Sequence, residues 1–133
     1  MKLGFVIIYV SDVKETLHFY KQAFDLEIKM EFEDEGILIY GEMETEGATL
    51  GFGSHEMGQE TLSGKYQKTT LKNEPFGQEI VFVSDDVTES YNKAIKAGAI
   101  SILAPEEKPW GQAVSYIRAK EGTLIEICSP MVD

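Results

Sequence analysis

The sequence has only one cysteine, Cys128, among its 133 residues, which excludes an internal disulfide. Basic residues are also scarce, because 12 lysines and arginines stand against 23 aspartates and glutamates, for a formal net charge of −11. Contacts with a nucleic-acid backbone or with anionic lipid need Lys or Arg, and no basic stripe supplies them. We therefore expect neither nucleic acid nor a membrane as a partner.

Long hydrophobic runs are absent as well. The apolar stretch at residues 5–10 is too short to cross a membrane, and it lacks the small-residue cleavage site of a signal peptide. It is typical of a first strand, and the expected location is cytoplasmic. The chain is 43% hydrophobic and 11% aromatic, enough for a real core. The sequence therefore predicts one compact domain over residues 1–133.

An internal repeat decides the architecture. Asp12 is followed by Glu15, and Asp86 by Glu89, an offset of 74 residues between the two copies. The same offset aligns Val13 with Val87 and Thr16 with Ser90. Asp followed three residues later by Glu is a variant of the capping box, so each copy predicts the start of a helix. The first helix is expected to end near residue 24 and the second at Gly98, which tolerates a positive φ.

One β-rich run precedes each predicted helix and three follow it. The eight predicted strands cover residues 5–10, 26–32, 37–42, 48–53, 79–83, 100–104, 113–118 and 123–128. This order gives an α+β fold made of two βαβββ modules, at about residues 3–54 and about 77–130. The polar segment at about 55–76 is expected to be the least structured part, either a linker or a loop that covers a site.

Several segments resemble a known family. They are Tyr9-Val10-Ser11-Asp12-Val13 with Phe19-Tyr20, Asp86-Val87 with Ala97-Gly98-Ala99, Trp110-Gly111-Gln112, and Glu121 to Ile127. In this order they resemble the vicinal oxygen chelate superfamily, which includes glyoxalase I, bleomycin-resistance proteins and extradiol dioxygenases. The resemblance implies a half-open barrel around a small-molecule cavity, with helices on the other face of the sheets, and a homodimer.

The resemblance also implies metal-ligand positions on the first and last strand of each module. Here they hold Phe5, Gly51, Glu79 and Glu126. Two carboxylates alone make a weak transition-metal site, because nitrogen donors supply much of its affinity. We therefore expect no cofactor, and a divalent metal at Glu79 and Glu126 is the alternative. If a metal is bound, His55 is the candidate for a supplementary metal ligand. If no metal is bound, His55 is expected to be a solvated loop histidine.

Alternation along the last strand gives Glu126 an orientation. Its neighbours Ile125 and Ile127 are expected to pack under a helix, so Glu126 points to the opposite, cavity side. Glu79 lies at a strand start, where a cavity position and an exposed one are equally compatible with the pattern. A carboxylate in an apolar pocket has a raised pKa, which suits a general base or an anchor for a cation. The sequence shows no obvious group that would stabilise an oxyanion in a glyoxalase-type proton transfer. Arg118 is a distant candidate for this role.

The expected cavity lining is largely aromatic. Strand alternation and the resemblance place the following ligand-binding residues around it: Phe5, Ile7, Tyr9, Gly51, Trp110, Gln112 and Tyr116. Aromatic faces stack on flat ligands or hold cations. The alternative is that these aromatic residues fill the barrel interior. Cys128 and His18 are interpreted as a small buried residue and a helix-surface or packing residue.

Three functions compete at this point. The leading hypothesis is binding of a small, partly aromatic or cationic molecule in an apolar cavity without metal. The alternative is a metal-dependent enzyme, either a glyoxalase-type lyase, an epimerase or an extradiol dioxygenase. The third is an interaction domain whose cavity is filled by side chains.

Overall fold

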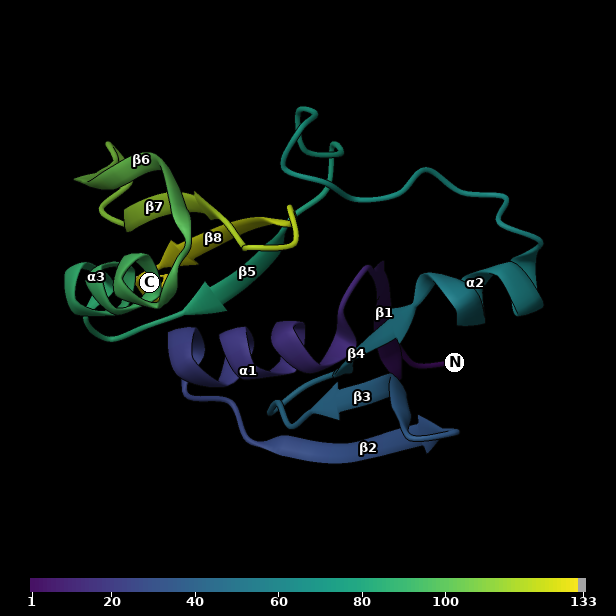
Figure 1. The fold of residues 1–133 in the computed structure, drawn as a ribbon. Helices are drawn as coiled ribbons and strands as arrows, with labels where there is room; N and C mark the ends of the chain where they lie inside the picture. Colours follow the sequence, from purple (N-terminus) through teal and green to yellow (C-terminus); the bar gives the residue numbers. More distant parts are fainter. Residues whose placement is uncertain (132–133) are drawn as a thin grey trace. The chain divides into compact units, whose positions relative to one another are not determined.

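The computed structural model describes residues 1–131, which contain two four-stranded sheets and three helices (Figure 1). The chain divides into two compact units between Lys68 and Thr69. No helix in the described part of the chain has the length and apolar character needed to span a bilayer. Each unit is built from one βαβββ repeat, and each is described by itself below.

The first unit runs β1 (Phe5–Val10), α1 (Val13–Phe24), β2 (Ile28–Asp34), β3 (Ile37–Met43), β4 (Thr49–Ser54) and α2 (His55–Leu62). The strand order is β1-β4-β3-β2, with β1 parallel to β4 and the other pairs antiparallel. Helix α1 packs on β3 and β4. We call the opposite side of this sheet the open face of the first sheet.

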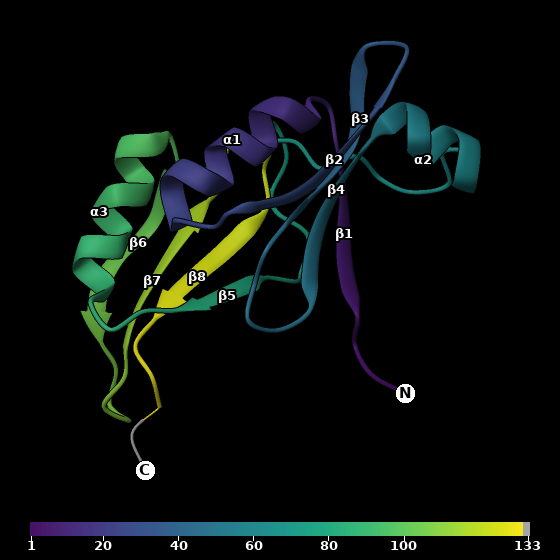
Figure 2. The ribbon, with the colours of Figure 1, turned by 90° about the horizontal axis from the view of Figure 1, so that it is seen from below.

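The second unit repeats this plan with β5 (Ile80–Val83), α3 (Val87–Ala97), β6 (Ile100–Glu107), β7 (Ala113–Arg118) and β8 (Leu124–Cys128). Its strand order is β5-β8-β7-β6, and β5 is parallel to β8. Helix α3 lies along one face of this sheet, against β6, β7 and β8 (Figure 2). The other side is the open face of the second sheet.

The predicted α+β fold of duplicated βαβββ modules is confirmed. The Asp12 side chain accepts a hydrogen bond from the Glu15 N–H at 2.9 Å, and Asp86 accepts one from the Glu89 N–H at 3.0 Å, so both copies of the capping motif start a helix. Helix α3 ends at Gly98 with φ 118°, as the glycine predicts. Neither four-stranded sheet closes on itself, which agrees with a half-open arrangement.

The polar segment after β4 is more ordered than the sequence predicts. Residues 55–62 form α2, because Ser54 caps the helix by accepting a hydrogen bond from the Met57 N–H at 3.1 Å. Tyr66 then folds back on Gly58, where any side chain at position 58 would collide with the tyrosine ring. The expectation of a linker or loop is therefore wrong for residues 55–62, whereas residues 63–79 form neither helix nor strand.

The cores of the two units lie on the helix sides of their sheets. In the first unit, Tyr20 of α1 packs on Phe52 of β4 with ring centroids 4.6 Å apart, and both side chains are fully buried. In the second, Ile117, Ile125 and Ile127 are fully buried. Because strand residues alternate, the residues between these positions lie on the open faces. The polar side chains considered next are found there.

Candidate functional site

The second unit places Glu126 where alternation predicts it, on the open face of the second sheet. Its neighbours Ile125 and Ile127 are buried on the helix side, whereas Glu126 is half-buried. Tyr116 of β7 is its partner across the strand pair, and the Tyr116 hydroxyl donates a hydrogen bond to Glu126 Oε1 at 2.9 Å. Burial and the adjacent Glu126 carboxylate raise the pKa of Tyr116 to about 12. Tyr116 therefore stays a neutral donor to the carboxylate.

Glu79 joins this pair from the residue before β5. The Glu79 side chain is exposed at the start of the strand, and slight desolvation together with the neighbouring Glu126 carboxyl raises the pKa of Glu79 above its ordinary value. Loss of the Glu79 proton would place a second negative charge beside Glu126, which favours the protonated form of Glu79. Burial and Glu126 also raise the pKa of the Cys128 thiol, which disfavours a nucleophilic thiolate. The cluster therefore places two neighbouring carboxyl groups, Glu79 and Glu126, beside one neutral hydroxyl donor, Tyr116.

The raised pKa of Glu79 predicts a pH-dependent stability. A carboxyl whose pKa is higher in the folded state contributes stability below its unfolded pKa, and the contribution is lost as the pH rises through its folded pKa. Glu79→Gln is therefore expected to match the wild type near pH 4, and to melt at a higher temperature at about pH 7. Thermal unfolding followed by circular dichroism measures this, with Glu107→Gln as a control. Parallel melting profiles for all three proteins would contradict a raised pKa of Glu79.

The side chains of Trp110 and Gln112 are hydrogen-bonded to each other. The Trp110 Nε1–H donates to Gln112 Oε1 at 2.9 Å, and Gln112 Nε2 donates to the Ser129 carbonyl at 2.9 Å. Trp110 itself is exposed. The Gln112 side chain thus fixes the turn before β7 to the chain after β8, so its hydrogen bonds go to Trp110 and Ser129 and not to the carboxylate pair.

In the first unit, Phe5, Ile7 and Tyr9 lie on the open face of β1. The two sheets have equivalent pairings of their first and last strands. Ile7 pairs with Gly51 in the first sheet, and Val81 pairs with Glu126 in the second. Gly51 thus holds the position in the first sheet that Glu126 holds in the second. A Cβ at Gly51 would lie 2.6 Å from the Tyr40 hydroxyl oxygen. The missing side chain makes room for Tyr40.

The carboxylate of the first unit lies one strand away, on a residue that the sequence reasoning missed. Glu42 of β3 pairs with Gly51, and the Tyr40 hydroxyl donates to Glu42 Oε2 at 2.7 Å. Burial and Glu42 raise the pKa of Tyr40, so this hydroxyl also stays neutral. The available signal was a single carboxylate in an apolar strand, two residues after a tyrosine and hence on the same face.

These residues do not fit the metal that the fold family implies. In the first unit, Phe5 has no donor atom and the side-chain space of Gly51 is filled by Tyr40. In the second, Glu126 already accepts a hydrogen bond from Tyr116, and Glu79 is exposed at the strand start. Within residues 1–131 no three His, Cys, Asp or Glu side chains are placed to hold an ion. We therefore derive no chemistry through a metal.

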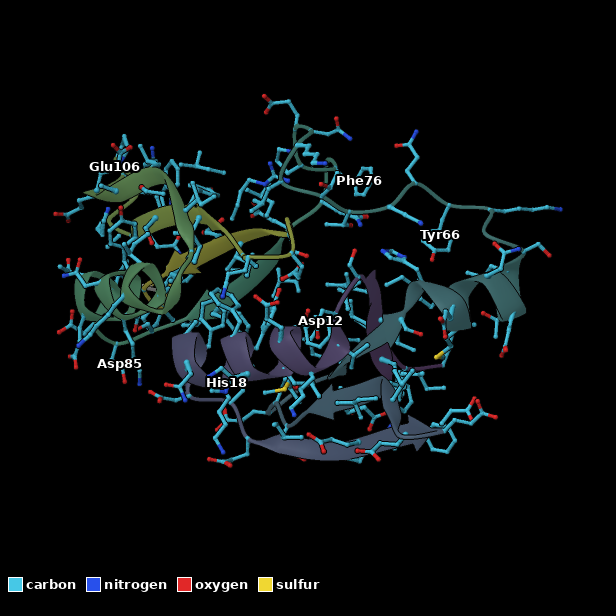
Figure 3. The ribbon with its side chains drawn as sticks, viewed as in Figure 1. Asp12, His18, Tyr66, Phe76, Asp85 and Glu106 are labelled. Carbon is cyan, nitrogen blue, oxygen red and sulfur yellow. The ribbon has the colours of Figure 1, made fainter. Side chains whose placement is uncertain are left out.

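Neither histidine is a loop residue. His18 is exposed on α1 (Figure 3), as expected for a helix surface. His55 opens α2, and its Nδ1 lies 2.8 Å from the Tyr66 hydroxyl, so the expectation of a solvated loop histidine is wrong. Its Nε2 is buried with no hydrogen-bond partner among the described residues, and burial followed by the nearby Lys68 lowers its pKa. His55 thus packs against Tyr66, which Figure 3 shows beside α2.

Arg118 is buried and bound to backbone carbonyls. Its guanidinium donates to Gly122 at 2.7 and 3.0 Å, to Asn73 at 2.7 Å and to Thr70 at 3.0 Å. These bonds tie the segment before β5 to the end of β7. Arg118 is therefore a structural clamp, and the possibility that it stabilises an oxyanion is not supported.

A comparison with protein-family profiles identifies one family. The sequence profile of the Glyoxalase-like domain matches residues 3–132. None of the curated proteins compared with the chain matches it. A glyoxalase/bleomycin resistance protein/dioxygenase family enzyme from Burkholderia phytofirmans PsJN is 21% identical, with a TM-score of 0.80, and the alignment covers 99% of this chain and 100% of that one.

Two further solved structures are similar. A glyoxalase-related enzyme from Fulvimarina pelagi is 14% identical, with a TM-score of 0.80 and coverage of 98% of this chain and 88% of that one. TioX from Micromonospora sp. ML1 is 17% identical, with a TM-score of 0.73 and coverage of 97% and 98%. At these identities the likeness establishes the fold.

Proposed function

Because this chain belongs to the glyoxalase-like domain family of the vicinal oxygen chelate superfamily, we propose that it binds a small cationic molecule on the open face of its second sheet, without a metal. The observation that carries the proposal is the cluster of Glu79, Glu126 and Tyr116. It concentrates one negative charge on a half-buried strand position and adds a neutral hydroxyl beside it. The ligand's charged group is proposed to bind between the two carboxyls.

The chemistry of the cluster defines the ligand. A hydrogen-bonding cation, such as a primary ammonium or an amidinium, can replace the proton on Glu79 and donate to both carboxylates. Val81 and Val83 are exposed on the same face of β5 and offer apolar contact to the rest of the molecule. The proposed ligand is therefore a small molecule with a cationic head and an apolar body.

Isothermal titration calorimetry with benzamidine tests this proposal. Glu126→Gln is expected to weaken binding by about tenfold or more, because it removes the charge to which the amidinium binds. Glu107→Gln changes the net charge equally on an exposed β6 residue and is expected to leave the affinity within about twofold. The wild-type affinity is expected to rise from about pH 5 to about pH 8, since the Glu79 proton has to leave.

A metal titration separates this proposal from a metal-dependent enzyme. Uptake of one equivalent of nickel, zinc, manganese or iron that Glu126→Ala abolishes would contradict metal-free binding. Equal benzamidine affinity in the wild type and in Glu126→Gln would contradict the proposed location.

A further inference from the structure

Helix α2 ends in a chain reversal that brings the following residues back to the helix. Ser63, which directly follows the helix, and Gly64 both have a positive φ, of 54° and 66°. The Gly64 N–H donates to the Gly58 carbonyl at 3.4 Å, across the last turn of the helix. The chain therefore returns toward α2, where Figure 3 shows Tyr66.

Tyr66 is held in this position by three contacts within the first unit. A Cβ at Gly58 would lie 2.4 Å from the Tyr66 hydroxyl oxygen, so the tyrosine occupies the space that the glycine leaves. The Tyr66 ring stacks on Tyr9 of β1 at a centroid distance of 5.1 Å. The Tyr66 hydroxyl lies 2.8 Å from His55 Nδ1, at the start of α2. We call residues 55–66, closed in this way, the Tyr66 latch.

The second ring nitrogen of His55 makes the latch sensitive to protonation. The Nε2 atom is buried and has no hydrogen-bond partner among the described residues. A neutral imidazole carries one N–H, whereas an imidazolium carries an N–H on both nitrogens and a positive charge. A buried N–H of a charged ring without an acceptor is costly. Protonation of His55 therefore favours a conformation in which Nε2 reaches water.

The charged groups near His55 do not remove this cost. Lys68 adds a second positive charge. Asp12, Lys14 and Glu56 line one cavity together with His55, and their charges differ in sign. Asp12 already accepts the hydrogen bond that starts α1, and none of the three is bonded to Nε2. Burial and Lys68 accordingly lower the pKa of His55.

We propose that the Tyr66 latch is released by acid, because protonation of His55 frees the Tyr66 ring. The ring then leaves Gly58 and Tyr9, and residues 63–68 separate from α2. The open form binds the proton more tightly than the closed form, so a fall in pH below the ordinary histidine pKa of about 6.5 favours opening. The device uses residues of the first unit alone, and so goes beyond the binding proposed for the second sheet.

Hydrogen exchange of the full chain, measured by mass spectrometry on peptides covering residues 55–68, tests the latch. After correction for the pH dependence of intrinsic exchange, the protection of this segment is expected to fall by about threefold or more from about pH 7.5 to about pH 5.5. His55→Gln keeps a hydrogen-bonding side chain that does not titrate, so its protection is expected to be equal at the two pH values. Gly58→Ala is expected to lose protection at both, because its methyl group would collide with Tyr66.

His18→Gln is the matched control, because it removes the other of the two histidines from an exposed helix position. It is expected to keep the wild-type pH dependence, and its single imidazole signal in NMR belongs to His55. We expect that signal to titrate below the ordinary histidine range, together with the Tyr66 ring signals. An ordinary or raised pKa of His55 in this protein would overturn the proposal. Unchanged protection at about pH 5.5, or an equal fall in the wild type and in folded His55→Gln, would overturn it as well.

Discussion

Replacing Arg118 with methionine is expected to lower the free energy of unfolding by about 3 kcal/mol and the melting temperature by about 10 °C. Arg118 is only 9% exposed, and it provides the hydrogen bonds for three backbone carbonyls. Methionine fills a similar volume but leaves these carbonyls without that donor. The cost is larger than for one hydrogen bond, because Gly122 and the segment at residues 70–73 lose their shared anchor together.

Two companion variants isolate this clamp. Lys72→Met removes the same charge from an exposed side chain of the clamped segment, and is expected to change stability by less than about 0.5 kcal/mol. Arg118→Lys keeps the charge but cannot reach three carbonyls, so an intermediate loss is expected. Limited trypsin digestion is expected to cut after Lys72 faster in Arg118→Met than in the wild type. A loss below about 1 kcal/mol with unchanged digestion would show that the guanidinium does not hold this segment.

The parts of the fold that local rules determine were predictable from the sequence. The Asp–Glu spacing at residues 12–15 and 86–89 predicts both βαβββ helix starts, because a cap is satisfied within one turn of chain. The orientation of Glu126 follows from the same kind of argument, since its two isoleucine neighbours determine which side faces the core.

The parts that depend on distant partners were not predictable. Tyr40 and Glu42 meet because Gly51, on the next strand, leaves space for the tyrosine hydroxyl. Arg118 bonds to carbonyls 45 and 48 residues earlier in the chain, so no local pattern reveals it. Helix α2 is short and polar, and it is held by Tyr66 contacts that become visible only in the fold.

Helix α1 and β3 are expected to be coupled through Gly41. A Cβ at Gly41 would lie 2.4 Å from Leu17 Cδ1, and Leu17 is fully buried. Gly41→Ala is therefore expected to cost about 2 kcal/mol by overpacking, and Leu17→Ala about 3 kcal/mol through the cavity that it leaves. In the double variant, the new methyl group lies in the space that the leucine vacates, so the two losses should not add.

Chemical denaturation of the four proteins measures the coupling free energy. We expect the double variant to be more stable than the sum of the single losses predicts, by about 1 kcal/mol or more. Gly47→Ala is the control, because nothing lies within 4 Å of its Cβ position. Strictly additive losses would show that α1 shifts freely over β3. Close contact at Gly41 matters for the open face, because residue 41 lies between Tyr40 and Glu42 and its orientation toward α1 turns both of them to the other side.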